Sequence, residues 1–173
     1  ILREERIGNQ RLLLGDCLAV MPLLGRFDAV VTDPPYGIGV DRAMAAKSGT
    51  RYGKSAAPAG HYKAQGWDDK PIGEDHVNAI TAAAKSQIIF GGNYFALPPA
   101  RCWLVWDKET NGNLADCELA WTNLPGAVRL MRHLWNGFAR KGGEARHGHP
   151  TQKPVALMEW CLSFLPDAKT ILD

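Results

Sequence analysis

The sequence predicts an α/β fold with one mostly parallel sheet, and three observations indicate this class. Short apolar, β-branched runs alternate with longer segments of helical pattern, as they do in β–α–β units. The clearest run, residues 27–32, is typical of a strand buried within a parallel sheet. Several runs end in Gly, Asp or Asn, so the sheet should gather polar groups along one edge.

The N-terminal part of the chain supplies two predicted strands and a short helix. Residues 11–14 are strand-like and stop at a Gly-Asp turn, and residues 18–24 have the length of one or two helical turns. The next strand covers residues 28–32. It ends before Pro34 and Pro35, because neither proline can donate a backbone hydrogen bond to a neighbouring strand.

The rest of the chain continues the alternation. In residues 75–85 apolar side chains recur on one side of a predicted helix. The strand-like runs that follow are apolar and end at Gly or Asp. The last helix can begin with Pro154 in its first turn, and it is apolar on most sides, so we expect it to be buried. The predicted elements are a helix over 75–85, strands over 86–90 and 102–106, one or two strands within 127–135, a helix over 154–165 and a strand over 169–173.

Length and composition predict a single domain over residues 1–173, with 46% hydrophobic and 22% charged residues. No apolar run approaches the length of a membrane span. The four cysteines are far apart and form no Cys-x-x-Cys pair, which favours a reduced, cytoplasmic protein. A zinc site built from Cys102, Cys117, His147 and His149 is disfavoured by its spacing, and we expect no metal.

The charge is unevenly distributed. The net charge is only +2, yet residues 41–66 carry +4 and residues 126–153 carry +5. Residues 41–66 are also rich in Ala, Gly, Ser and Lys without a sustained apolar period, which predicts a long mobile loop. The two basic segments fit contacts with a polyanion, although two solvated loops would show the same pattern. On this basis His133 and His147 are interpreted as surface or phosphate-contacting residues.

The most informative segment is Asp33-Pro34-Pro35-Tyr36, which follows the predicted strand directly. It places a carboxylate, two proline-stiffened carbonyl groups and an aromatic ring where open α/β sheets bind their ligands. Such a group can hold a flat, hydrogen-bonding base. A strand followed by a simple proline turn is the alternative interpretation.

Read together, several segments resemble the DNA amino-methyltransferases, which methylate exocyclic amino groups with S-adenosylmethionine. Asp33-Pro34-Pro35-Tyr36 is similar to the catalytic motif of that family. The other similar segments are Gly15-Asp16-Cys17, Gly91-Gly92-Asn93-Tyr94-Phe95, Trp106-Asp107-Lys108, Glu118-Leu119-Ala120-Trp121 and His149-Pro150-Thr151-Gln152-Lys153-Pro154.

The order of these segments resembles the circularly permuted, β-type arrangement of the family. The resemblance therefore implies a Rossmann-like methyltransferase sheet that is permuted and truncated at its C-terminal end. In the family a glycine-rich cofactor loop should begin at Asp173, the last residue of this sequence. Because that loop would follow residue 173, the resemblance implies that these residues carry only part of the cofactor site.

The resemblance also implies roles for individual residues. Asp33 and the Pro34 carbonyl would accept the hydrogens of a target amine, and Tyr36 would stack on a base flipped out of the duplex. An Asp in the first position favours adenine N6 as the target, with cytosine N4 as the alternative. The residues implied in binding S-adenosylmethionine are Asp16, Cys17, Asp33, Thr151, Gln152, Lys153 and Asp173. The catalytic residues implied are Asp33, Pro34, Pro35 and Tyr36.

The implied partner is double-stranded DNA, with no membrane contact. The predicted phosphate contacts are Arg42, Lys47, Arg51, Lys54, Arg140 and Lys141. The sequence leaves open a homodimeric state and a cognate restriction endonuclease. Two other functions remain as alternatives, a methyltransferase acting on protein or small-molecule amides and an inactive DNA-binding remnant without the cofactor loop.

Overall fold

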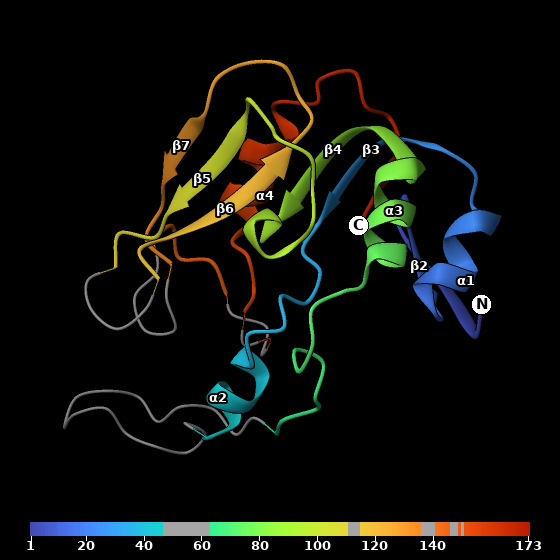
Figure 1. The fold of residues 1–173 in the computed structure, drawn as a ribbon, viewed down its shortest axis with the longest axis horizontal. Helices are drawn as coiled ribbons and strands as arrows, with labels where there is room; N and C mark the ends of the chain where they lie inside the picture. The colour runs from blue at the N-terminus through green and yellow to red at the C-terminus, as the bar shows by residue number, and fades with distance from the viewer. Residues whose placement is uncertain (47–62, 111–114, 136–140, 146–148, 150) are drawn as a thin grey trace.

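The computed structural model describes residues 1–46, 63–110, 115–135, 141–145, 149 and 151–173 (Figure 1). It confirms the α/β class, with a six-stranded sheet in the order β7-β5-β6-β4-β3-β8 and a separate two-stranded sheet, β1-β2. The strands of the large sheet are β3 (Phe27–Thr32), β4 (Ala84–Phe90), β5 (Trp103–Asp107), β6 (Cys117–Thr122), β7 (Arg129–Arg132) and β8 (Ile171–Leu172).

The large sheet is mostly parallel, as predicted. β3 pairs in parallel with β4 and β8, and β5 pairs in parallel with β7. β6 is inserted between β4 and β5 and is antiparallel to both. The carboxyl ends of the parallel strands therefore meet the amino end of β6 at one edge of the sheet. Asp33, Gly91 and Asp107 lie at this edge, together with Glu118 near the start of β6.

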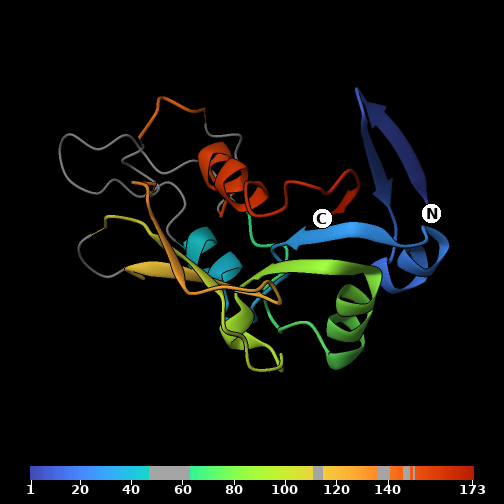
Figure 2. The same ribbon diagram turned by 90° about the horizontal axis from the view of Figure 1, so that it is seen from above.

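Helices cover both faces of the sheet (Figure 2). α4 lies over one face, and α3 lies on the opposite side. The described helical segments are α1 (Cys17–Val20), a 3-10 turn η1 (Met21–Leu23), α2 (Val40–Ala46), α3 (Glu74–Ala83), a 3-10 turn η2 (Gly92–Tyr94) and α4 (Val155–Leu162). None of the helices in the described residues has the length and apolar character that crossing a bilayer requires.

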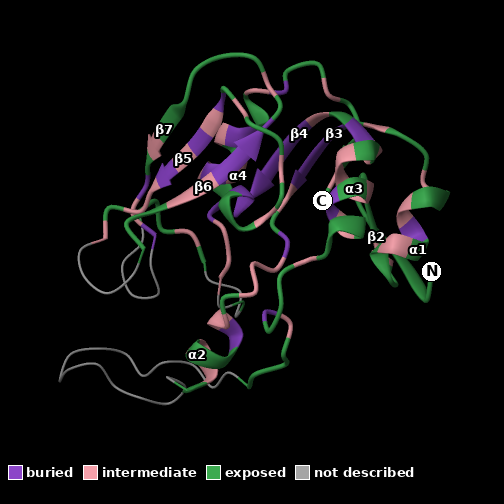
Figure 3. Ribbon diagram, in the orientation of Figure 1, coloured by how far each residue is buried: buried purple, intermediate pink, exposed green. Residues whose placement is uncertain are grey.

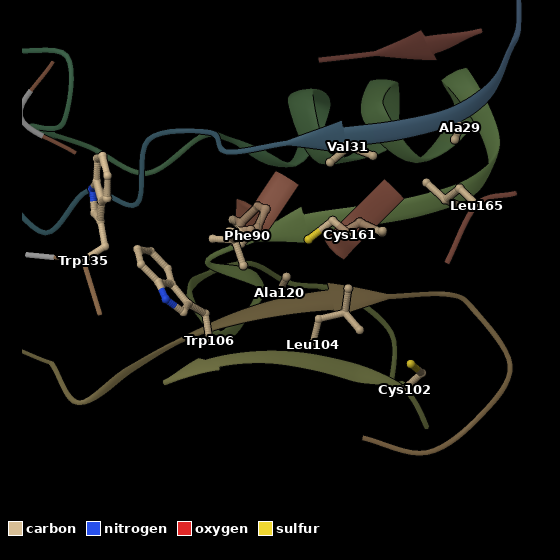
Figure 4. Close-up of a cluster of buried hydrophobic side chains, with 12 residues drawn as sticks. Ala29, Val31, Phe90, Cys102, Leu104, Trp106, Ala120, Trp135, Cys161 and Leu165 are labelled. Carbon is tan, nitrogen blue, oxygen red and sulfur yellow. The ribbon is translucent and has the colours of Figure 1, made fainter. Parts of the chain in front are cut away.

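The main core lies between the sheet and α4 (Figure 4). Successive side chains of a strand point to opposite faces, so Ala29 and Val31 face α4 while Val30 faces the other layer. On α4, Leu157 and Cys161 are fully buried against these strands. The whole cluster consists of Ala29, Val31, Ile88, Phe90, Cys102, Leu104, Trp106, Ala120, Trp135, Leu157, Cys161 and Leu165.

The N-terminal strands form an exposed hairpin of β1 (Arg3–Ile7) and β2 (Gln10–Leu14), visible in green in Figure 3. β2 confirms the strand predicted over 11–14, but it pairs with β1 and not with the large sheet. The segment before β8 is tied to β3 by Asp28, whose carboxylate accepts hydrogen bonds from the backbone of Lys169 and from Thr170.

Three expectations from the sequence need correction. The first part of the predicted 41–66 loop is helical, because α2 extends to Ala46 and the buried Asp41 fixes it by accepting hydrogen bonds from the amides of Gln65 and Gly66. α4 is less buried than its apolar sequence suggests, since Val155 is 55% exposed. β6 was not predicted as a strand at all.

Candidate active site

Asp33 lies directly after β3, at the edge where the parallel strands end. The chain turns there because Pro34 and Pro35 cannot extend the strand pairing. Pro34 is buried and anchors the turn, while the Asp33 side chain remains 30% exposed. The predicted position of the carboxylate at a strand end is confirmed.

Both carboxylate oxygens of Asp33 are engaged by other side chains. The Tyr36 hydroxyl donates a hydrogen bond to Asp33 Oδ1 at 2.5 Å. The Lys153 ammonium donates to Asp33 Oδ2, also at 2.5 Å, from a position 120 residues further along the chain. Charge-assisted hydrogen bonds of this kind are about twice as strong as neutral ones. Asp33 is thus held as an oriented acceptor, not as a freely rotating surface carboxylate.

Lys153 belongs to a row of alternating charges that extends to β6. Its Nζ atom also lies 3.1 Å from Glu118 Oε2, and Lys108 forms an ion pair with Glu118 Oε1. Burial opposes the charge on Lys153, but Asp33 and Glu118 outweigh it and raise the pKa of the ammonium group. Burial likewise opposes the charge on Glu118, yet Lys153 and Lys108 hold its pKa below the ordinary value. Lys153 and Glu118 are therefore both charged near neutral pH.

Tyr36 is held in place by an aromatic group from the segment after β4. Its ring stacks on Tyr94 with centroids 5.1 Å apart and meets Phe95 edge-on at 6.3 Å. Gly91 has a φ of 67°, and a Cβ atom there would lie 2.1 Å from the Tyr36 ring. Burial and the nearby Asp33 carboxylate strongly raise the pKa of Tyr36, so its hydroxyl remains a donor. Glycine at position 91 is required for this close approach.

The backbone after Tyr36 is fixed by a buried carboxylate. Asp68 is 1% exposed, and its two oxygens accept hydrogen bonds from the amides of Gly37 at 2.7 Å and Val40 at 2.8 Å. Pairing of Tyr36 with Pro71 adds a second connection between the same two segments. The position of Tyr36 thus depends on residues more than thirty positions away.

A cavity of about 150 Å³ lies on the opposite side of the Asp33 turn from α4. Its lining is mostly apolar and includes Cys17, Pro34, Pro35, His76 and Asp173. Within the described residues, the buried His76 Nδ1 has no hydrogen-bond partner. Burial of the Asp173 carboxyl group raises its pKa, and the nearby negative charge of Asp33 raises it further. The cavity therefore combines a mostly apolar wall with the His76 ring nitrogen, which could form a hydrogen bond with a ligand.

The structure brings Cys17 and Asp173 to this cavity, but it gives Asp16 a different contact. Asp16 is the N-cap of α1, and its Oδ1 atom accepts hydrogen bonds from the amides of Leu18 and Ala19. Such capping typically contributes about 0.5–2 kcal/mol to helix stability. Asp16 thus has a structural role that the sequence analysis did not include.

Thr151 and Gln152, two of the residues that the resemblance implies in cofactor binding, lie just before α4, and the backbone donors of a helix N-terminus favour a carboxylate. A carboxylate does lie there, but it belongs to the chain: Glu144 Oε2 accepts a hydrogen bond from the Val155 amide at 2.8 Å. Gln152 donates to the carbonyl of Ala145, and Thr151 lies beside His149 Nδ1 at 3.3 Å. The helix N-terminus thus attracts an anion, as expected from its dipole.

Few of the predicted DNA contacts can be placed. Arg42 is exposed and forms a bidentate ion pair with Asp69. Lys141 is exposed at the start of the described residues 141–145. His133 is buried, contrary to expectation, because its amide continues the pairing of β7 with β5 and its carbonyl accepts from Trp106. Four of the predicted contacts lie outside the described residues: Lys47, Arg51, Lys54 and Arg140.

The sequence analysis gave no role to Glu118, Lys108 or Asp68. Glu118 was quoted within a motif, but only the antiparallel direction of β6 brings its side chain to the Asp33 edge. Asp68 follows Trp67 in a segment without a recognisable period, so no local pattern indicated its burial. The described residues contain no cluster of His, Cys, Asp or Glu that could hold a metal ion.

Comparison of the chain with protein-family models, with curated proteins and with solved structures gave no match.

Proposed function

We propose that this chain is the catalytic domain of a DNA methyltransferase that transfers a methyl group from S-adenosylmethionine to the N6 amine of a flipped adenine. The observation that supports it most is the Asp33 carboxylate, which is exposed at the strand edge and already accepts two hydrogen bonds. The Rossmann-like, circularly permuted arrangement is part of the same proposal. The mostly parallel sheet is consistent with it.

The chemistry requires an acceptor more than a base. The exocyclic nitrogen of adenine is a weak nucleophile because its lone pair is delocalised into the ring. Asp33 and the Pro34 carbonyl would accept its two hydrogens, which localises the lone pair and directs it toward the methyl carbon. As the N–C bond forms and the S–C bond breaks, positive charge develops on nitrogen, and the Asp33 carboxylate stabilises it. The nitrogen then releases a proton to solvent.

The cavity beside the Asp33 turn fits the adenine end of the cofactor. It has an apolar wall of prolines, and the buried His76 Nδ1 lacks a partner within the described residues. Cys17 and Asp173 would bind that end of the cofactor. When bound, the cofactor supplies a methyl group on a sulfonium, and the chain's own residues position the amine in line with it. The residues before α4 would hold the methionine end after Glu144 leaves the helix N-terminus.

The target base must leave the duplex to reach Asp33, because its amino group is inaccessible inside paired DNA. Two basic segments, 41–66 and 126–153, carry the positive charge that phosphate binding requires. We place the DNA contacts on these segments, with Arg42 exchanging Asp69 for a phosphate group.

The direct test is a methyl-transfer assay with labelled S-adenosylmethionine and unmethylated duplex DNA of mixed sequence. Digestion to nucleosides then shows which base carries the label. We expect N6-methyladenine from the unaltered protein, and a loss of at least about a hundredfold in Asp33→Ala, within the range for a transition-state charge stabiliser. Asp167→Ala is the matched control, because Asp167 is exposed and is not among the residues assigned to the site.

Other products would indicate the alternatives. Label on cytosine N4 would show that the target is cytosine. Label on a protein extract, and not on DNA, would favour an amide methyltransferase. DNA binding without any transfer would favour a DNA-binding remnant. Undiminished product from Asp33→Ala would refute the catalytic role of Asp33.

A further inference from the structure

Lys153 lies between two carboxylates and is bound to them unequally. Its ammonium is 2.5 Å from Asp33 Oδ2 and 3.1 Å from Glu118 Oε2. The side chain is only 10% exposed, so water can do little to replace either partner. The rings of Phe90 and Tyr36 lie 5.2 Å and 5.8 Å from Nζ and attract the same cation. The ammonium is thus surrounded by two carboxylates and two aromatic rings of the protein.

The contact with Asp33 conflicts with binding of a substrate amine. An amine that is to be methylated must donate a hydrogen to an Asp33 oxygen, but Tyr36 engages Oδ1 and Lys153 engages Oδ2. A neutral amine competes poorly with an ammonium for a carboxylate, because only the ammonium gains a full ionic attraction. Each carboxylate oxygen has two lone pairs, so the amine can reach Oδ2 beside Lys153, but it binds strongly there only after the ammonium has moved away.

Glu118 provides the place to which the ammonium can go. Its Oε2 atom is buried and accepts no well-aligned hydrogen bond within the described residues, although it forms an ion pair with Lys153 Nζ at 3.1 Å. Its other oxygen is fixed by Lys108, which keeps the carboxylate in position. A small movement of Lys153 toward Glu118 completes that hydrogen bond and frees Asp33 Oδ2. The charge of Lys153 stays compensated throughout, which avoids the penalty of a buried unpaired ion.

We propose that Lys153 is a positioning residue with two positions, which blocks Asp33 when the site is empty and transfers to Glu118 when the target amine binds. The inference rests on the proposed function and names the residues that control access to the same carboxylate. Glu118 is then a second positioning residue, whose purpose is to receive the ammonium.

The test is whether removing Lys153 rescues a defect caused by removing Glu118. In Glu118→Gln the ammonium has only Asp33 as a charged partner. We therefore expect kcat/KM for methylation of DNA to fall by about tenfold or more, which corresponds to the loss of one hydrogen bond to a charged group. Adding Lys153→Met should recover part of this loss, because Asp33 Oδ2 is then open. Glu109→Gln, an exposed neighbour on the same edge, should behave like the unaltered protein.

A merely structural role for the two residues predicts the opposite result. If the Glu118→Gln/Lys153→Met protein is no more active than Glu118→Gln while the unaltered protein methylates DNA, the two-position proposal is wrong and the proposed function survives. If the unaltered protein transfers no methyl group, the proposed function fails, and this inference fails with it. Thermal melting identifies variants that do not fold, and Glu118→Asp, which keeps the charge but retracts it, then replaces Glu118→Gln.

A second measurement needs no turnover. NMR of the labelled Lys153 side chain reports the surroundings of its ammonium group. A short DNA duplex with one unpaired adenine, at saturating concentration, should shift this signal in the unaltered protein, and the shift should be much smaller in Glu118→Gln. An unchanged signal in the unaltered protein at saturation would overturn the proposal.

Discussion

Replacing Gly91 with alanine tests the close approach that holds Tyr36 against Asp33. Two costs are expected. Gly91 has φ 67° and ψ 20°, and an L-residue in this left-handed conformation destabilises the folded state by about 1–2 kcal/mol. The added Cβ would also lie 2.1 Å from Tyr36 Cε1, and relieving such overpacking costs about 1–3 kcal/mol more. We therefore expect the free energy of unfolding to fall by about 2–5 kcal/mol.

Gly25→Ala is the matched control, because Gly25 has φ 77° and a Cβ there would have no neighbour within 4 Å. It should show the backbone cost alone, about 1–2 kcal/mol. Urea unfolding with an unchanged m-value gives both numbers. In a Tyr36→Ala background the extra cost of Gly91→Ala should disappear, since the ring that it strikes is gone. Equal losses in Gly91→Ala and Gly25→Ala would refute the steric argument.

Three further predictions concern DNA binding, the turn after Tyr36 and acid stability. The double variant Arg51→Ala/Lys54→Ala should weaken DNA binding and reduce the slope of log affinity against log salt concentration by about two. The control double variant Arg3→Ala/Arg26→Ala should leave the slope unchanged. If the two double variants have equal slopes, Arg51 and Lys54 do not contact phosphate groups. Asp68→Asn places an amide group of a buried side chain against the backbone donors of Gly37 and Val40, so it should lower the free energy of unfolding in urea by about 1–3 kcal/mol. The exposed Asp69→Asn should lower it by less than about 1 kcal/mol. Hydrogen bonds from Thr170 and Lys169 lower the pKa of Asp28, so its contribution to stability is present above the unfolded-state pKa and is lost as the pH falls through the lowered value; Asp28→Asn should flatten this acid limb of a pH-resolved melting curve, whereas Asp167→Asn should not.

The sequence was sufficient to predict the elements whose signals are local. β3 combines a β-branched run with two prolines that stop it, and β4 ends at a pair of glycines. Because parallel strands end at one edge, these two signals also predicted where Asp33 would lie. The helix predicted over 75–85, which is α3 (Glu74–Ala83), was found for the same reason, from apolar residues that recur on one side.

The features that were missed depend on pairing between distant residues. β6 begins with Cys117 and Glu118, and nothing local shows that it enters the sheet in reverse between β4 and β5. The Lys153–Asp33 pair joins residues 120 positions apart, so its existence follows only from the assembled sheet and α4. β1, the first strand of the N-terminal hairpin, was missed because its exposed residues lack the apolar pattern that predicted β2.

The expected cofactor roles of Lys153 and the α4 N-terminus can be judged from the charges already present. One ammonium that is paired with Asp33 and Glu118 cannot also neutralise a ligand carboxylate without giving up one of them. The Val155 amide at the start of α4 already binds the Glu144 carboxylate, so a ligand carboxylate must displace it. In each exchange the incoming anion takes over a cationic or dipolar partner that a carboxylate of the chain holds in the empty site. The proposed binding of a ligand carboxylate at this edge would therefore be an exchange of carboxylates at the Lys153 ammonium and at the α4 N-terminus, and its affinity would depend on the difference between the incoming and the outgoing anion.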